Sequence, residues 1–328
     1  MSESFRWGIL GTGGIARTFA SDLQLLPGHE IGAVGSRTIG KAESFAAEFS
    51  AQPYGSYEAL VESDVDAIYV ATPHTLHAEN SILALNAGKP VLCEKPFAVN
   101  VKEAEAMVAA SRANHVALME GMWSRFLPTY QVIREVVASG ELGELVAIYA
   151  DHGQALPANP YYRLHAPELA GGALLDLGIY PISLTFMILG DPDSVMATAI
   201  KTDTGVDAQT SFIFSYVSGQ HSIMTTTLEV RTPCTAKIIG TRGRIEVDSN
   251  FYTPTSMRVI IDGEATQGIP ANYQGHGIRE QAAHFAEIVR SGAIESPLMS
   301  HDESLAIMDC MDEIRYQIDL KYPFENND

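Results

Sequence analysis

The chain has 328 residues, 46% of them hydrophobic, and this length predicts about two domains. Forty acidic residues against 21 basic ones give a formal net charge of −19, which argues against nucleic acid or an anionic membrane as partner and requires that any anionic ligand have its own local cations. The three cysteines, Cys93, Cys234 and Cys310, have no metal-ligand spacing, so we expect them in the core and predict no metal site and no disulfide framework.

We also expect no membrane helix, because no apolar run approaches the ~20 residues that such a helix needs. The first residues, MSESFRWGILGTGG, lack the basic and hydrophobic regions of a signal peptide. The sequence therefore predicts a cytoplasmic location.

The first predicted elements are a strand and a helix joined by a glycine-rich turn. Residues 5–10 form the strand, and the turn reads Gly11-x-Gly13-x-x-Ala16. Gly11 permits the tight turn, Gly13 lets the backbone approach a pyrophosphate, and the small Ala16 lets the helix pack closely on the strand. Such a turn can also bind nothing, but here strand, turn and helix follow in the required order. We therefore predict a dinucleotide site that includes Gly11, Gly13, Gly14, Ile15 and Ala16.

The end of the next strand, residues 29–38, indicates which dinucleotide is bound. NAD-binding chains usually place an acid there for the ribose 2′-hydroxyl, whereas NADP-binding chains need a cation. This strand ends with Ser36 and Arg37 and has no acid, and Lys41 follows one helical turn later. The two cations could be ordinary solvated charges, but the missing carboxylate favours NADP(H), bound by Ser36, Arg37 and Lys41.

Strands and helices continue to alternate up to residue 98. Residues 63–73 form a buried strand that ends at Thr72 and Pro73, residues 75–88 form a helix, and residues 89–98 form the next strand. Ligands of open parallel sheets bind beyond the carboxyl ends of the strands. We therefore expect Thr72, Pro73, His77, Glu94 and Lys95 to contribute to the cofactor site.

Lys95 is the most informative of these residues. It lies at the end of an apolar strand, and Pro96 holds it in an extended conformation, outside any following helix. A Glu-Lys-Pro triplet by itself is more often a solvated strand exit than a catalytic element. Its place at a carboxyl end nevertheless predicts that Lys95 faces the nicotinamide end of the cofactor cleft.

The pattern changes after residue 121, which predicts an α/β fold of two domains. Residues 1–121 form a doubly wound parallel sheet of the Rossmann type, and residues 122–328 form an α+β domain with a large, mainly antiparallel open-faced sheet. A helix over 125–143 is followed by a run of strands, and helices over 277–292 and 302–318 complete the chain. The expected strands cover residues 145–153, 195–202, 208–217, 221–230, 235–241, 243–248 and 257–262.

Residues 168–190 are expected to carry the acid–base chemistry. The sequence predicts a helix after Gly171 and Gly172, with Asp176 and Tyr180 spaced i, i+4 on one face. This pair could merely satisfy each other in the packing, or it could point into a cleft. Spacing alone leaves both interpretations open.

Together these motifs resemble a known family. The turn at 11–16, VATPHTLHAENSILALNAGKPVLCEKPFA at 70–98 and GGALLDLGIYPISL at 171–184 are similar to the NAD(P)-dependent glucose-fructose oxidoreductase and inositol dehydrogenase family. EGMWSRFLPTY at 120–130 and Tyr180, where most members have a histidine, resemble most its dimeric dihydrodiol dehydrogenase and NADP-dependent D-xylose dehydrogenase branch. The resemblance implies a homodimer or homotetramer formed through the C-terminal sheet.

The resemblance also implies roles for single residues. Tyr180 is the expected general acid/base, Lys95 the cation that favours its phenolate, and Asp176 an orienter of substrate hydroxyls. Trp123 and Phe126 are expected as apolar walls of the substrate site, although such aromatics are more often core residues. The loop at 152–172 adds candidate hydroxyl-binding residues: His152, Tyr161, Tyr162, Arg163 and His165.

Three functions remain open at this point. The first is an NADP-dependent dehydrogenase of a pyranose C1 hydroxyl or a trans-dihydrodiol, with a small polyol, sugar or diol as substrate. The second is a reductase of a sugar-derived carbonyl that uses the same residues in reverse. The third is a cofactor-binding sensor without turnover, which would not need Lys95, Asp176 and Tyr180.

Overall fold

The computed structural model describes residues 4–159 and 161–327, and these form two compact units. The first unit contains the chain up to Trp123 together with Gly275–Met308. The second contains Ser124–Gln274 and the chain from Asp309 onward. From the sequence, the chain is divided once, at residue 121. In the structure the chain passes from the first unit to the second after Trp123 and returns to the first unit over Gly275–Met308.

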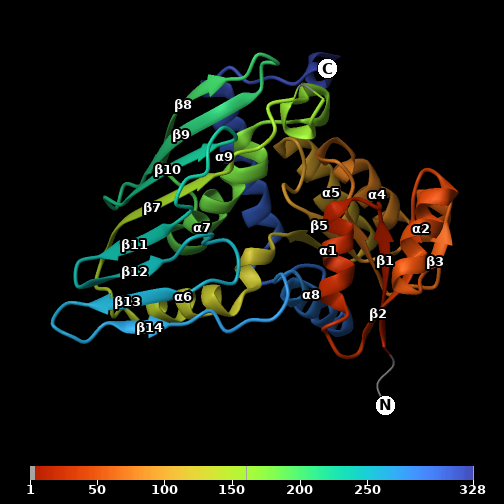
Figure 1. Ribbon diagram of the computed structural model, residues 1–328, viewed down its shortest axis with the longest axis horizontal. Coiled ribbons are helices and arrows are strands. Elements are labelled where there is room, and N and C mark those ends of the chain that lie inside the picture. Colours follow the sequence, from red (N-terminus) through yellow and green to blue (C-terminus); the bar gives the residue numbers. More distant parts are fainter. Residues whose placement is uncertain (1–3, 160, 328) are drawn as a thin grey trace. The chain divides into compact units, whose positions relative to one another are not determined.

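The first unit is built on a six-stranded parallel sheet, which confirms the predicted Rossmann-type fold (Figure 1). Its strand order is β3-β2-β1-β4-β5-β6, so the order reverses between β1 and β4. The strands are β1 (Phe5–Leu10), β2 (His29–Gly35), β3 (Gln52–Tyr54), β4 (Ala67–Val70), β5 (Val91–Glu94) and β6 (Leu118–Gly121). The helices are α1 (Gly14–Leu23), α2 (Ile39–Phe49), α3 (Tyr57–Val61), α4 (His77–Asn86), α5 (Val101–Asn114), α8 (Arg279–Ser291) and the first part of α9 (His301–Gln317).

Burial explains why these segments form strands and helices. Every residue of β4, β5 and β6 is buried, as expected for strands covered on both faces. In α1 the buried apolar residues recur at helical spacing, at Ala16, Phe19, Ala20 and Leu23. The three cysteines are also buried, as predicted.

Asp22 explains why the chain returns to the first unit. Its carboxylate is 3% exposed and accepts hydrogen bonds from the backbone N–H groups of His276, Gly277, Ile278 and Arg279, at 2.7–3.1 Å. These groups lie at the start of α8, where a helix has unpaired N–H donors and favours negative charge. Asp22 of α1 therefore fixes α8 beside α1, by a contact that spans more than 250 residues of sequence.

The second unit contains an eight-stranded, mostly antiparallel sheet, as predicted. Its order is β14-β13-β12-β11-β7-β10-β9-β8, and among the described strands of this sheet only β7 and β10 pair in parallel. The strands are β7 (Leu145–Gly153), β8 (Ser194–Lys201), β9 (Asp207–Ser215), β10 (His221–Thr227), β11 (Ala236–Gly240), β12 (Gly243–Val247), β13 (Met257–Ile261) and β14 (Gln267–Ile269).

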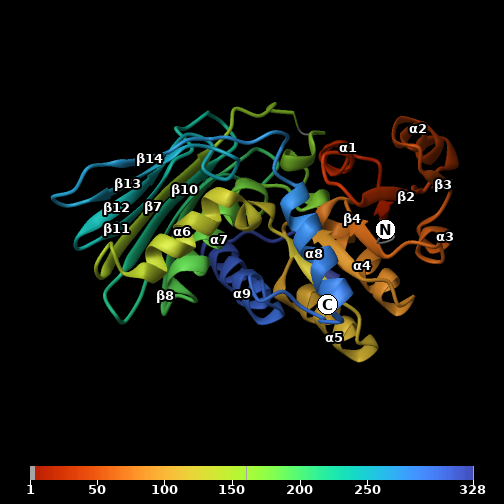
Figure 2. The ribbon, with the colours of Figure 1, turned by 90° about the horizontal axis from the view of Figure 1, so that it is seen from below.

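Two helices cover one face of this sheet, α6 (Pro128–Ser139) and α7 (Ile179–Leu189) (Figure 2). None of the helices described for this unit covers the opposite face (Figures 1 and 2). That face carries exposed apolar side chains on neighbouring strands: Tyr149, Met196, Ile200, Ile213 and Ile223. The helix predicted over 125–143 is shorter than expected, because Pro128 starts α6 after a 3-10 turn at Trp123–Phe126.

The segment that contains Asp176 differs from the prediction in its helical type. Leu174–Gly178 forms a π-helix that runs directly into α7, so Asp176 and Tyr180 are not one α-helical turn apart. Residues 167–189 are also long and apolar enough to cross a membrane, contrary to the expectation that no run reaches this length. Since 83% of their most apolar window is buried inside the protein, they are accounted for as a core helix.

Candidate functional site

The first unit has a cavity of about 580 Å³ beyond the carboxyl ends of β1, β2 and β4. Seven of the residues predicted to bind a cofactor line it: Gly11, Gly13, Ser36, Arg37, Lys41, Thr72 and Pro73. The other lining residues are Thr12, Arg17, Thr38, Ser44, Tyr57 and Ala71. The structure thus brings together residues from three successive strand ends, at the point where the strand order reverses.

Two glycines shape the floor of this cavity. Gly11 has a φ of +114°, and a Cβ there would lie 2.7 Å from the carbonyl oxygen of Ala71, so only glycine fits. A Cβ on Gly13 would meet no atom within 4 Å and would project into open space. The backbone at the N-terminus of α1 is therefore open to a ligand that approaches closely.

The cavity is electropositive although the chain is strongly acidic. Arg17, Arg37 and Lys41 line it, and no aspartate or glutamate is among its lining residues. The first turn of α1 also has no acidic residue, so its free N–H groups face the cavity without a competing carboxylate. These features fit a dinucleotide: the pyrophosphate at the N-terminus of α1 and an additional phosphate at Ser36, Arg37 and Lys41.

Arg17 was not predicted from the sequence. Its Nη1 donates to the carbonyl oxygen of Thr12 at 2.9 Å, and its Nη2 contacts Glu48 Oε1 of α2 at 2.9 Å. The guanidinium also lies 5.1 Å from the centre of the Phe45 ring. These contacts hold a cation beside the glycine turn. The one sequence signal was its position one helical turn after Gly13.

His77 and Lys95 lie at the ends of β4 and β5. His77 is fully buried, with Nε2 3.0 Å from the carbonyl oxygen of Thr72 and Nδ1 2.8 Å from that of Pro96. His77 therefore joins the two loops that follow these strands. Lys95 is half-buried directly after β5, and the Lys95–Pro96 peptide bond is cis.

Among the remaining residues predicted for these sites, Glu94, Trp123 and Ala16 are buried, whereas Ile15 and Phe126 are half-buried and Gly14 is exposed. Glu94 is 4% exposed and accepts a hydrogen bond from the Tyr69 hydroxyl. Trp123 is 2% exposed, and its ring centre lies 5.1 Å from that of His276. Phe126 lies at the end of the 3-10 turn, and Gly14, Ile15 and Ala16 begin α1 without being among the residues that line the cavity.

The second unit brings Asp176, Arg163 and Tyr180 into one region. Arg163 Nη2 donates to Asp176 Oδ1 at 3.0 Å, so this carboxylate has a cationic partner. Asp176 and Tyr180 are each only 6% exposed. The Tyr180 ring centre lies 4.7 Å from that of Tyr252 and 5.2 Å from that of His152, two rings that the sequence did not connect with it.

Arg125, a cation that the sequence analysis did not identify, lies against α7 in the second unit. It is 1% exposed, and its Nε and Nη2 donate to the hydroxyl and the carbonyl oxygen of Ser183, both at 2.8 Å. Ser183 follows Tyr180 by three residues. Arg125 therefore fixes the turn of α7 that follows the candidate acid/base.

Asp207 of β9 fixes the start of the same helical segment. Its Oδ2 accepts hydrogen bonds from Leu174 N at 2.8 Å and from Thr210 Oγ1 at 2.7 Å. Gly172, with a φ of +125°, lies so close that a Cβ would overlap Asp207 Oδ1. Burial raises the pKa of Asp207 to about 6, against the opposing effect of these hydrogen bonds.

Comparison with known proteins gives matches along the whole chain. Residues 5–122 match the family described as "Oxidoreductase family, NAD-binding Rossmann fold", and residues 130–246 match "GFO/IDH/MocA C-terminal domain". The chain is 36% identical to trans-1,2-dihydrobenzene-1,2-diol dehydrogenase of Danio rerio, over 97% of this chain and 98% of the relative. It is 38% identical to D-xylose 1-dehydrogenase (NADP(+)) of Hypocrea jecorina, over 98% and 93% of the two chains.

A similar solved structure is a 3-ketoreductase from Actinomadura kijaniata in complex with NADP and TDP-benzene. The TM-score is 0.85 and the identity is 27%, with 96% of this chain and 98% of that chain covered. The likeness therefore extends over both units.

The buried Asp207 carboxyl leads to a prediction about stability. Its pKa of about 6 lies above the ordinary value of 3.8, so between these values the folded protein holds a proton that the unfolded chain has released. The free energy of unfolding should therefore fall as pH rises, by about 3 kcal/mol in total from this group. Asp207→Asn keeps an oxygen acceptor for Leu174 N but does not ionise, so this fall should be absent in the variant.

Urea unfolding from about pH 4.5 to about pH 7.5 measures the difference between the two proteins. Asp207→Asn should gain stability relative to the wild type as pH rises. Asp302→Asn is the control, because this side chain is 83% exposed. A difference between Asp207→Asn and wild type that does not change with pH would show that Asp207 titrates normally.

Proposed function

We propose that this chain, which belongs to the GFO/IDH/MocA family of NAD(P)-dependent oxidoreductases, uses NADP to oxidise a hydroxyl-bearing carbon of a small ring compound. The substrate class is a sugar, oxidised at the pyranose C1, or a trans-dihydrodiol. The observation that carries the proposal is the cavity with three cations and no carboxylate at the carboxyl ends of the first sheet.

The choice of NADP rests on the end of β2. Ser36 and Arg37 follow this strand where NAD-binding chains usually place an acid, and Lys41 lies in the same cavity wall. We assign these three residues to the 2′-phosphate and the N-terminus of α1 to the pyrophosphate. The D-xylose relative is an NADP(+) dehydrogenase and the solved 3-ketoreductase is in complex with NADP, which supports this choice.

The acid–base step is assigned to Tyr180. When bound, the nicotinamide accepts the hydride, and a protein base must take the hydroxyl proton. A free tyrosine has a pKa near 10, so it needs a cation that favours the phenolate, and we assign this role to Lys95. Asp176 and Arg163, which pair at 3.0 Å, are assigned to the orientation of substrate hydroxyls.

A second candidate is the reverse reaction, reduction of a sugar-derived carbonyl with NADPH. The likeness to the 3-ketoreductase over 96% of the chain favours it. The same residues serve in this direction, with Tyr180 giving its proton to the carbonyl oxygen. Rates measured in both directions with NADP⁺ plus D-xylose and with NADPH plus a ketosugar distinguish the two.

We also propose that the chain forms a homodimer or homotetramer through the open face of its eight-stranded sheet. Apolar side chains such as Met196, Ile200 and Ile213 are exposed on that face, at 69%, 61% and 37%. Contiguous exposed apolar surface is typical of protein interfaces. Sedimentation equilibrium should give at least twice the mass of one chain, and a monomer at micromolar concentration would contradict the proposal.

The cofactor assignment predicts the effect of Arg37→Ala. Loss of one charge-assisted hydrogen bond to a phosphate costs roughly 1.5–3 kcal/mol, so NADPH should bind about 10- to 150-fold more weakly. Binding of NADH, which has no 2′-phosphate, should hardly change. Fluorescence titration with both cofactors measures this, with Arg112→Ala as control, because Arg112 pairs with Asp302 outside the cavity. Equal weakening of both cofactors would show that Arg37 does not read the 2′-phosphate.

The assignment of the base predicts that Tyr180→Phe keeps the fold but lowers kcat by roughly 10²–10⁴. The rise of kcat/KM with pH that a tyrosine base produces should also disappear. Tyr130→Phe is a matched control, since burial raises the pKa of Tyr130 and keeps its hydroxyl protonated. Should Tyr180→Phe retain normal oxidation with an unchanged pH profile, another group would be the base.

A further inference from the structure

Two adjacent glycines, Gly171 and Gly172, connect the loop that carries Arg163 with the π-helix that carries Asp176. Gly172 has a φ of +125°, and a Cβ on Gly171 would lie 2.7 Å from the carbonyl oxygen of Leu164, so only glycine fits at these two positions. The backbone N–H of Gly172 donates to the same carbonyl oxygen at 2.9 Å. This glycine turn therefore sets where the backbones of the two ion-paired site residues meet.

A turn of two glycines does not hold one conformation by itself, because glycine has the widest range of backbone conformations. Contacts from other elements must select one. Asp207 does so at Gly172, since its Oδ2 accepts from Leu174 N and its Oδ1 lies against Gly172. Tyr322, near the C-terminal end of the chain, does so at Gly171, whose carbonyl oxygen accepts a hydrogen bond from the Tyr322 hydroxyl at 2.7 Å.

Tyr322 is itself held in place. It is fully buried, and burial raises the pKa of its hydroxyl, which therefore stays protonated and donates to the carbonyl that it faces. The Arg315 guanidinium lies 4.7 Å from the ring centre and pairs with Glu325, whose carboxylate also accepts from Tyr322 N at 2.9 Å. The 3-10 turn Pro323–Asn327 contacts the 3-10 turn Pro167–Leu169 in the loop before the glycine turn. The C-terminal segment thus fixes the Tyr322 hydroxyl at that turn.

We propose that Tyr322 is a positioning residue for substrate binding: its hydrogen bond to Gly171 selects the conformation of the glycine turn in which Arg163 and Asp176 pair and orient substrate hydroxyls. Tyr322 acts through the turn, because its fully buried side chain does not reach a ligand. This inference rests on the proposed function, because it concerns the orientation of the same substrate.

The first test is Tyr322→Phe, which keeps the ring beside Arg315 and removes only the hydroxyl. When a smaller fraction of the protein has the binding-competent turn, KM rises by the inverse of that fraction, whereas bound substrate reacts normally. With NADP⁺ and D-xylose as probe, followed by NADPH absorbance, kcat/KM should fall roughly 3- to 10-fold, mainly through KM. Fluorescence titration should give an unchanged affinity for NADPH, because the cofactor cavity belongs to the first unit.

The second test asks whether Tyr322 acts through the Arg163–Asp176 pair. Arg163→Met removes one partner of this pair, so Tyr322→Phe in that background should lower kcat/KM by less than about twofold. A hydroxyl with a purely structural role would lower kcat/KM by the same factor in both backgrounds. The ratio kcat/KM stays measurable even where KM exceeds the attainable D-xylose concentration. Circular dichroism and the urea midpoint verify that each variant is folded.

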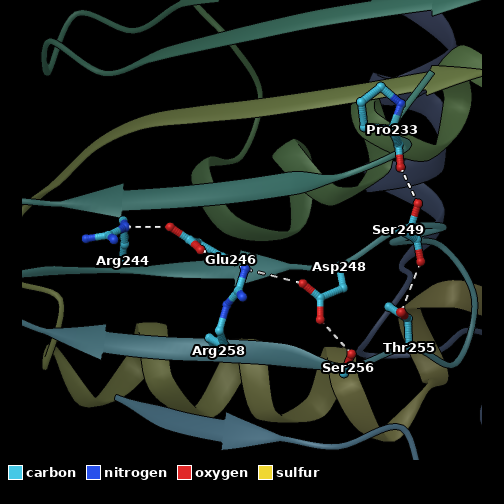
Figure 3. A network of polar contacts seen from close by, with 8 residues as sticks. All are labelled: Pro233, Arg244, Glu246, Asp248, Ser249, Thr255, Ser256 and Arg258. Atoms are coloured by element: carbon cyan, nitrogen blue, oxygen red, sulfur yellow. Dashed lines mark hydrogen bonds and ion pairs between the residues drawn. The ribbon is translucent and has the colours of Figure 1, made fainter. Parts of the chain in front are cut away.

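Two control variants each remove one hydrogen bond elsewhere in the second unit. Tyr216→Phe is matched in substitution and in bond type, because the Tyr216 hydroxyl donates to the carbonyl oxygen of Gly190 at 3.0 Å, after the end of α7. Ser256→Ala removes a bond of 2.6 Å to Asp248 Oδ2, in a network that includes no residue of the glycine turn (Figure 3). Both variants should keep kcat/KM within about twofold of the wild type.

The outcomes separate this inference from the proposed function. If the wild type oxidises D-xylose and folded Tyr322→Phe does so with kcat/KM within about twofold, the inference is wrong and the proposed function stands. An equal loss in the wild-type and Arg163→Met backgrounds, or the same loss in Tyr216→Phe, would also overturn it, since the hydroxyl would then act on the stability of the whole unit. If the wild type turns over neither D-xylose nor a trans-dihydrodiol, the proposed substrate class fails and the inference fails with it.

Discussion

A chain with a net charge of −19 repels a polyanionic dinucleotide, and the structure reverses this repulsion in one place. The cavity beyond β1, β2 and β4 has cations in its wall and no carboxylate. The glycines at its floor let a ligand reach the N-terminus of α1, where free N–H groups add to the positive potential. The one acid of α1, Asp22, lies at the far end of the helix and accepts hydrogen bonds from backbone N–H groups at the start of α8. Local cations and N–H donors therefore make a dinucleotide site in an acidic chain, and N–H donors at the start of α8 bind Asp22 and bring the chain back to the first unit.

In the second unit, contacts from other elements fix the position of one helical segment, which consists of the π-helix Leu174–Gly178 and α7. Asp207 accepts from its first backbone N–H groups, His152 faces the carbonyl of Leu177, and Arg125 binds Ser183 one turn after Tyr180. Each contact pairs a polar backbone or hydroxyl group that would otherwise be buried without a partner. The π-helix is therefore held at its start and near its end, and α7 is held at Ser183, so Tyr180 in the first turn of α7 has little freedom. Pre-organisation of this kind is what acid–base catalysis requires.

The sequence predicts best what depends on neighbouring residues. The turn from Gly11 to Ala16 and the basic strand end at Arg37 are local patterns, and the periodicities of strands and helices predict both sheets. It fails where a property depends on residues far apart: the return of Gly275–Met308 follows from Asp22, which no local pattern connects with α8. The π-helix at Asp176 could not be predicted, because the spacing of apolar residues does not distinguish a π turn from an α turn. Tyr252 meets His152 and Tyr180 only through the pairing of strands that are distant in the chain, so this contact had no signal in the sequence.

The most direct test of the central claim is a crystal structure of the protein with NADP⁺. The account predicts the 2′-phosphate within hydrogen-bond distance of Arg37, about 2.7–3.2 Å, and the pyrophosphate over the N-terminus of α1 beside Gly13. The nicotinamide should lie toward the ends of β4 and β5. A 2′-phosphate that contacts none of Ser36, Arg37 and Lys41, or a pyrophosphate away from the glycine turn, would contradict the account.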